Sequence, residues 1–137
     1  MSMDYWGIVG YGVDIDDISK YINHEKVNKL VRELLPDEDF EDSDVMDDDT
    51  FYGNPYFNFA EFLCKLDDDK IFDYDDDGQG RAFLLYHPTY AWTRRSNEPS
   101  SCDECEQKLI KLLKKVCDCS TDDLLRHVGY INTYGGA

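Results

Sequence analysis

Residues 5–13 read Tyr-Trp-Gly-Ile-Val-Gly-Tyr-Gly-Val, and this stretch decides the fold. Its aromatic and β-branched residues favour a strand, because such side chains pack well on a pleated surface. Successive side chains of a strand alternate, so Trp6 and Ile8 lie on one face and the tyrosines and valines lie on the other. Both faces are therefore apolar or glycine, which is typical of a buried strand. We predict that residues 5–13 form the central strand of a sheet.

Helical periodicity follows this strand and recurs later in the chain. Apolar residues three and four positions apart predict a short helix after residue 14, a second helix that ends before Pro36, and a third helix near residues 59–66. A long helix over residues 103–117 and a short one after residue 120 complete the set. Each helix begins at a residue whose side-chain oxygen can accept a backbone N–H. These predicted N-caps are Asp14, Asn23, Asn58, Ser101 and Ser120.

Three more strands are expected. Residues 70–75 and 80–87 form a hairpin whose turn contains Asp77-Gly78, and residues 128–134 form the last strand. The main elements then follow the order βαββαβ, which is the split βαβ order of a ferredoxin-like sandwich. We predict a single α+β domain over residues 1–137, with an antiparallel sheet, helices on one face, and an acidic insertion at residues 37–50.

The charge of the chain limits what it can bind. Its 137 residues include 30 acidic and 14 basic ones, which gives a formal net charge of −16. Such a chain repels phosphate, so we expect no direct binding to nucleic acid or to an anionic membrane. The natural targets are proteins with basic surfaces. We found no apolar run long enough to cross a membrane and no signal peptide, so a cytoplasmic protein is expected.

The predicted first strand places Tyr5 and Tyr11 on the same face as Val9. Aromatic residues on the sheet of a βαββαβ fold stack RNA bases in some RNA-binding modules. Because a charge of −16 opposes the phosphates of RNA, we expect these three side chains to be covered instead. The cover is expected to be a helix, the 36–56 segment or a protein partner.

The five cysteines predict free thiols in a reducing compartment. Cys102 and Cys105, and Cys117 and Cys119, have spacings that resemble zinc ligands. A helix over residues 103–117 places the two pairs about 18 Å apart, so one zinc ion cannot bind both. No histidine or serine lies in a catalytic spacing. We therefore predict no metal, no cofactor and no catalytic residue.

A calcium-binding module is an alternative suggested by residues 73–78, Asp-Tyr-Asp-Asp-Asp-Gly. Acids at the first, third and fifth positions and glycine at the sixth match the first half of an EF-hand loop. The second half does not match, because Leu84 stands where a bidentate glutamate is needed. The flanking residues also read as strands. A tight acidic hairpin is the interpretation that we prefer.

Two acidic clusters, at residues 37–49 and 67–77, hold more than half of the acids and are interleaved with aromatic residues. Alternate residues of a strand lie about 6.6 Å apart, so Asp73, Asp75 and Asp77 are expected to form a regular row. Such a row approximates successive phosphates of a nucleic-acid strand, and a basic groove would release counterions on meeting it. The candidate partner-binding residues are Asp37, Glu38, Asp39, Glu41, Asp42, Asp44, Asp47, Asp48 and Asp49 in the first cluster, and Asp67, Asp68, Asp69, Asp73, Tyr74, Asp75, Asp76 and Asp77 in the second.

In size, charge and the alternation of aromatic residues with acids, the chain resembles small acidic phage proteins, which include anti-CRISPR proteins and other DNA mimics. The resemblance implies an inhibitor that evades host defence in the cytoplasm of a bacterial host cell. It implies a basic nucleic-acid-binding protein as the partner, such as a CRISPR effector nuclease. An immunity-type inhibitor of a basic toxin is the alternative within the same class, and a nucleotide-handling enzyme that uses the sheet face belongs to a different one.

Overall fold

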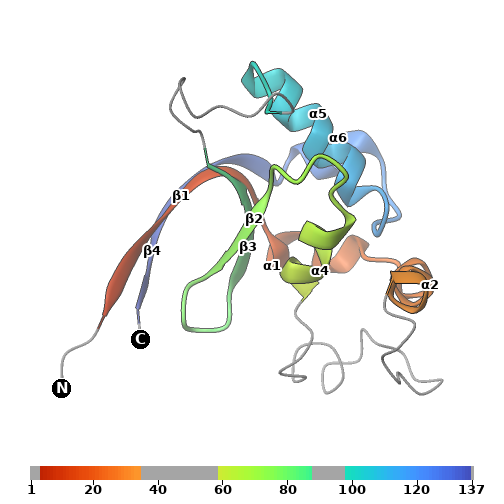
Figure 1. The fold of residues 1–137 in the computed structure, drawn as a ribbon, viewed down its shortest axis with the longest axis horizontal. Helices are drawn as coiled ribbons and strands as arrows, with labels where there is room; N and C mark the ends of the chain where they lie inside the picture. Colours follow the sequence, from red (N-terminus) through yellow and green to blue (C-terminus); the bar gives the residue numbers. More distant parts are fainter. Residues whose placement is uncertain (1–3, 35–58, 88–97, 137) are drawn as a thin grey trace.

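A computed structural model describes residues 4–34, 59–87 and 98–136 (Figure 1). These residues form an α+β domain around a four-stranded sheet with the strand order β2-β3-β1-β4. Every neighbouring pair of strands is antiparallel. The strands are β1 (Tyr5–Asp14), β2 (Asp73–Asp76), β3 (Ala82–Tyr86) and β4 (Val128–Gly136).

The predicted central strand is confirmed, because β1 lies between β3 and β4. β3 in turn lies between β1 and β2, so β1 and β2 run in the same direction with one strand between them. The α+β class, the antiparallel sheet and the hairpin are likewise confirmed, and the arrangement is broadly ferredoxin-like. The predicted acidic insertion at residues 37–50 lies outside the described residues.

The helices gather on one side of the sheet (Figure 1). Local capping explains where several of them begin: the Asp14 carboxylate accepts the N–H of Asp16, and the Ser101 hydroxyl accepts that of Glu104. Ser120 and Asp123 form the complete capping box. The predicted cap Asn58 lies outside the described residues. The helical elements are α1 (Ile15–Ile18), the 3-10 turn η1 (Ser19–Tyr21), α2 (His24–Leu34), α4 (Phe59–Leu66), α5 (Cys102–Leu113) and α6 (Thr121–Leu125).

The main core lies between these helices and the sheet. Val13 of β1 and Leu84 of β3 are fully buried there, and both belong to a cluster with the apolar stripes of α2, α4 and α5. Burying each such side chain contributes about 1.5–3 kcal/mol. Leu34, the last residue of α2, lies outside this core with 46% of its surface exposed. No helix in the described parts of the chain is long and apolar enough to cross a membrane.

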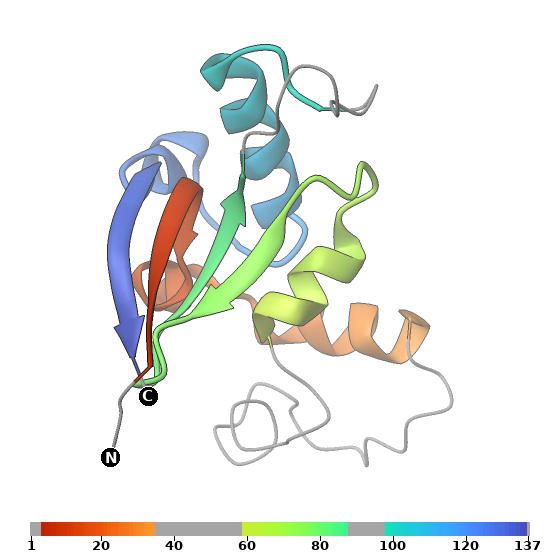
Figure 2. The same cartoon turned by 60° about the vertical axis from the view of Figure 1, so that its left-hand side comes forward.

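On the face away from the helices, the sheet curves over its own surface. The strands curve until the two edge strands meet at one end, where the N–H of Gly136 donates to the carbonyl oxygen of Asp77 (3.0 Å). Beside this contact, the Trp6 Nε1–H donates to the carbonyl oxygen of Asp76 (2.9 Å). We call these two contacts the seam; Figure 2 shows the β2–β3 turn beside the end of β4.

The seam encloses a second, smaller core. Ile8, Phe83 and Leu85 are buried on this inner face, and Trp6 and Ile131 pack against them. A glycine in the turn permits the approach of the two edges: Gly78 has a φ of +74°, and a Cβ there would lie 2.4 Å from the carbonyl oxygen of Gly136. The sequence pattern did not predict this closure.

Candidate partner-binding surface

The edge strand β2 carries most of the acids that the sequence singles out. Asp73 and Asp75 lie opposite Leu85 and Phe83 of β3, so they share one face of the strand. Tyr74 and Asp76 lie on the other face, and both are exposed. Because β2 has only one neighbour among the described strands, its acids line the outer rim of the sheet.

The predicted row of three carboxylates ends at Asp75. Asp77 is turned into the hairpin, where its Oδ1 accepts the N–H of Gln79 (2.8 Å) and of Arg81 (3.0 Å). These hydrogen bonds, the one from Arg81 first, hold the pKa of the Asp77 carboxyl below its usual range. Asp75 itself lies 3.4 Å from Nε2 of His87. The residues of the calcium-loop alternative are thus part of a hairpin, with one Asp77 oxygen already hydrogen-bonded.

The second acidic stretch, Asp67–Asp69, is largely used within the fold. Asp67 is only 5% exposed, and its carboxylate accepts the N–H groups of Asp69, Ile71 and Phe72. Asp68 pairs with Lys115 (3.2 Å) and Asp69 with Lys108 (2.7 Å). The hydrogen bond from Lys108 lowers the pKa of the Asp69 carboxyl. Asp67 is therefore a structural residue, which the expectation of a surface contact did not foresee.

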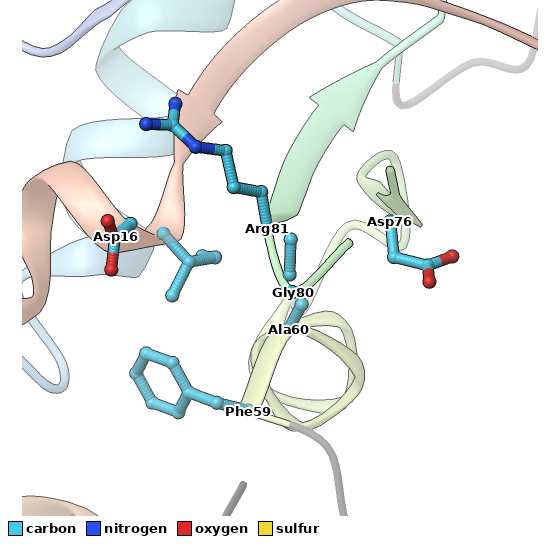
Figure 3. Close-up of a pocket in the computed structure, with 8 residues that line it drawn as sticks. Asp16, Phe59, Ala60, Asp76, Gly80 and Arg81 are labelled. Carbon is cyan, nitrogen blue, oxygen red and sulfur yellow. The ribbon is translucent and has the colours of Figure 1, made fainter. Parts of the chain in front are cut away.

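The structure adds acids that sequence reasoning missed. The first helix brings Asp16 and Asp17 close to the β2–β3 hairpin, where they line two neighbouring pockets of about 290 and 280 Å³. Asp76 lines the first pocket with Asp16, and Asp77 lines the second with Asp17. Figure 3 shows Arg81 between Asp16 and Asp76, with the Asp76 carboxylate pointing away from it.

Arg81 organises this region. It lines both pockets, and its guanidinium Nη1 lies 2.9 Å from Oδ2 of Asp14. Asp14 is buried, and burial raises the pKa of its carboxyl. One signal in the sequence pointed here: Asp-Ile-Asp-Asp at residues 14–17 follows the central strand directly, and β1 pairs with β3 close to the hairpin turn.

Four exposed carboxylates on this rim have side chains that form no hydrogen bond or ion pair within the described residues. We call them the open carboxylates, and they come from α1 and β2. Their side chains are exposed, while the neighbouring Asp14, Asp68 and Asp69 are paired with Arg81, Lys115 and Lys108. The open carboxylates are Asp16, Asp17, Asp73 and Asp76. The candidate residues between Asp37 and Asp49 lie outside the described part of the chain.

The cysteines are placed by the helices and not by a common site. Cys105 and Cys117 are buried in the main core, and burial raises the pKa of their thiols to about 11 and about 12. Cys102 is exposed at the start of α5. Within the described ranges, no group of three or more His, Cys, Asp or Glu side chains is placed to hold a metal ion.

Comparison with known proteins gives no relative for this chain. No protein-family model matches it, and searches of curated proteins and of solved structures find no match.

Proposed function

We propose that this protein is an inhibitor that binds the basic nucleic-acid-binding channel of a partner protein, with its carboxylates in the place of nucleic-acid phosphates. The observation that carries the proposal is the set of four open carboxylates on the rim formed by α1 and β2. The nearby Asp14, Asp68 and Asp69 pair with Arg81, Lys115 and Lys108, whereas these four carboxylates have no such partner among the described residues.

The physics of the proposal is electrostatic. A basic channel holds condensed or bound anions, and a rigid acidic surface that replaces them gains the entropy of their release. A net charge of −16 also steers the encounter, so association is fast at low salt and weakens as salt is added. Binding then blocks the channel sterically, without any chemical step.

The partner class follows from the same chemistry. A CRISPR effector nuclease has the required basic channel for a nucleic acid, and the resemblance to phage anti-CRISPR proteins favours it. An immunity-type inhibitor of a basic toxin would use the same carboxylates. The two differ in the identity of the captured protein.

Capture on the immobilised chain tests the proposal. The four open carboxylates are changed together, Asp16→Asn, Asp17→Asn, Asp73→Asn and Asp76→Asn. Bound proteins from a lysate of the source cell are then identified and quantified. We expect the parent chain to retain a basic nucleic-acid-binding protein that double-stranded DNA displaces. We expect the quadruple variant to retain at least about tenfold less of it, because several charge contacts are lost together.

A charge-matched control separates the rim from net charge. Its four substitutions remove the same charge from exposed positions on α2, on α6 and before α6. Retention by the control equal to that of the parent supports the rim as the contact, whereas equal losses in both variants would show an effect of net charge alone. Undiminished capture by the rim variant would contradict the proposal. The control substitutions are Glu25→Gln, Glu33→Gln, Asp118→Asn and Asp122→Asn.

A further inference from the structure

The ribbon of β1 and β4 carries exposed tyrosines on the helix side of the sheet, in the part that extends beyond the helices. Tyr5, Tyr130 and Tyr134 are 73%, 67% and 78% exposed, and Val9 beside them is also exposed. The register brings them together: Tyr134 lies opposite Gly7, and Tyr130 lies opposite Tyr11. We call Tyr5, Val9, Tyr130 and Tyr134 the tyrosine face.

Of the three side chains that we expected to be covered, Tyr11 lies under a helix. Tyr11 is half-buried, and its hydroxyl donates to the Glu106 carboxylate of α5 (2.8 Å), which confirms a helix over that residue. Tyr5 and Val9 are exposed, so no described helix covers them, and the other two expected covers, the 36–56 segment and a protein partner, lie outside the described residues. Large aromatic side chains at such positions are the residues that anchor protein–protein contacts.

The chemistry around the tyrosine face selects a cationic occupant. Neither β1 nor β4 contains a lysine or arginine, so no base within these strands occupies the tyrosine rings. Asp4 is exposed immediately before Tyr5. The seam then joins Gly136, which lies opposite Tyr5, to Asp77 and so to the rim with the open carboxylates.

We propose that the tyrosine face binds arginine side chains of the same basic partner, which lie across the tyrosine rings while neighbouring basic groups meet the open carboxylates. This inference rests on the proposed function and names a second contact surface for it. Arginine stacks on aromatic faces and is more weakly hydrated than lysine, so it suits an exposed ring better.

Charge argues against two other occupants. A second copy of the chain would bring another charge of −16 to the same face, and self-repulsion opposes this. Single-stranded nucleic acid can stack its bases on tyrosine, but the acids at Asp4 and on the rim repel its phosphates. A basic protein surface satisfies both the rings and the carboxylates.

Two model peptides test the proposal with the intact chain. One alternates arginine and glycine, the other alternates lysine and glycine, and both have equal length and charge. Fluorescence anisotropy at low salt gives each dissociation constant. We expect the arginine peptide to bind about three- to tenfold more tightly, because the planar guanidinium stacks on aromatic rings and is more weakly hydrated than an ammonium group.

Paired variants assign the difference to the rings. Tyr130→Thr with Tyr134→Thr keeps strand propensity and removes the rings, so we expect it to abolish the preference for arginine. Tyr130→Phe with Tyr134→Phe keeps the rings and should keep the preference. Asn132→Thr, on the exposed side of β4 between the two tyrosines, serves as the control and should behave as the parent.

Each outcome bears on one of the two proposals. Equal affinity for both peptides, failure of both to bind, or an unchanged preference in the threonine variant overturns the tyrosine contact. The same assay on the rim variant tests the proposed function separately. If the rim variant loses all peptide binding while the tyrosine variants bind as the parent does, the tyrosine contact is overturned and the proposed function stands. A ring-dependent complex with single-stranded RNA in a gel shift, or a ring-dependent dimer in sedimentation, also overturns the inference.

Discussion

The N–H of Gly136 donates a hydrogen bond to the carbonyl oxygen of Asp77, with an N···O distance of 3.0 Å. These two residues belong to opposite ends of the strand order, one at the end of edge strand β4 and one just after edge strand β2. Their contact closes one end of the sheet and fixes the acidic rim next to the β1–β4 ribbon. Function, as proposed, depends on this closure, because it holds two contact surfaces in one relative position.

Closure of the sheet can be tested at Gly135. A Cβ at Gly135 would lie 2.5 Å from ring atoms of Trp6, whose Nε1–H bonds to Asp76 across the seam. We expect Gly135→Ala to lower the free energy of unfolding by about 1–3 kcal/mol, as overpacking does elsewhere. Urea denaturation measures the change.

Gly129 provides the matched control for this prediction. It lies in the same strand, and a Cβ there has no neighbouring atom within 4 Å. Gly129→Ala should leave the free energy of unfolding the same or slightly higher, since alanine is less flexible than glycine in the unfolded chain. Equal losses in the two variants would show that the seam contributes nothing specific.

Asp67 and its neighbour Asp68 are predicted to differ sharply in their effect on stability. Asp67→Asn keeps one accepting oxygen and replaces the other with an NH2 group that cannot accept a backbone N–H, so we expect a loss of about 2 kcal/mol. Asp68→Asn removes an exposed ion pair with Lys115 and should cost less than about 0.5 kcal/mol. Thermal or urea unfolding of the two variants checks both values, and a reversed order would contradict the structural role of Asp67.

Local signals made much of the fold predictable. A capping box such as Ser120–Asp123 is encoded within four residues, and its geometry is as the sequence indicates. The central strand was predictable because both of its faces are apolar. The seam was not, since it depends on Trp6, Gly78 and Gly136, which are far apart in the sequence and carry no periodic signal.

The candidate site was predictable only in part for the same reason. Asp73 and Asp76 were identified from their density in one stretch, and the structure places them on an exposed rim. Asp16 and Asp17 were missed because only the pairing of β1 with β3 brings α1 next to the hairpin. Asp67 was misjudged because composition cannot tell a carboxylate that binds backbone N–H groups from one that faces solvent.

Thiol reactivity should follow the burial of the cysteines. Cys105 and Cys117 are buried, and the pKa of each thiol is raised, to about 11 and about 12, so the reactive thiolate is scarce at neutral pH. We expect iodoacetamide to modify exposed Cys102 in the native protein and to modify Cys105 and Cys117 only after unfolding. Mass spectrometry of the digested protein locates the label. Rapid native labelling of Cys105 would show that α5 does not pack as described.

The pH dependence of stability should contain a contribution from Asp77. Its carboxyl has a lowered pKa because the oxygen accepts the backbone N–H of Arg81 and of Gln79. The native state therefore binds the proton less readily than the unfolded chain does. By linkage, the stabilisation is complete above the ordinary pKa of aspartate, about 3.9, and is lost as the pH falls through the lower native value.

Substitution separates this contribution from those of other acids. Asp77→Asn keeps an oxygen that can accept in the turn but removes the titrating group, so its unfolding free energy should fall less steeply than that of the parent below about pH 4. The contribution of Asp14 to the pH dependence has the opposite sign. Burial raises the pKa of its carboxyl, so the native state binds that proton more tightly than the unfolded chain does. Urea denaturation at a series of pH values from about 6 to about 2.5 gives both profiles. Parallel profiles for parent and variant would show that the turn does not depend on the charge of Asp77.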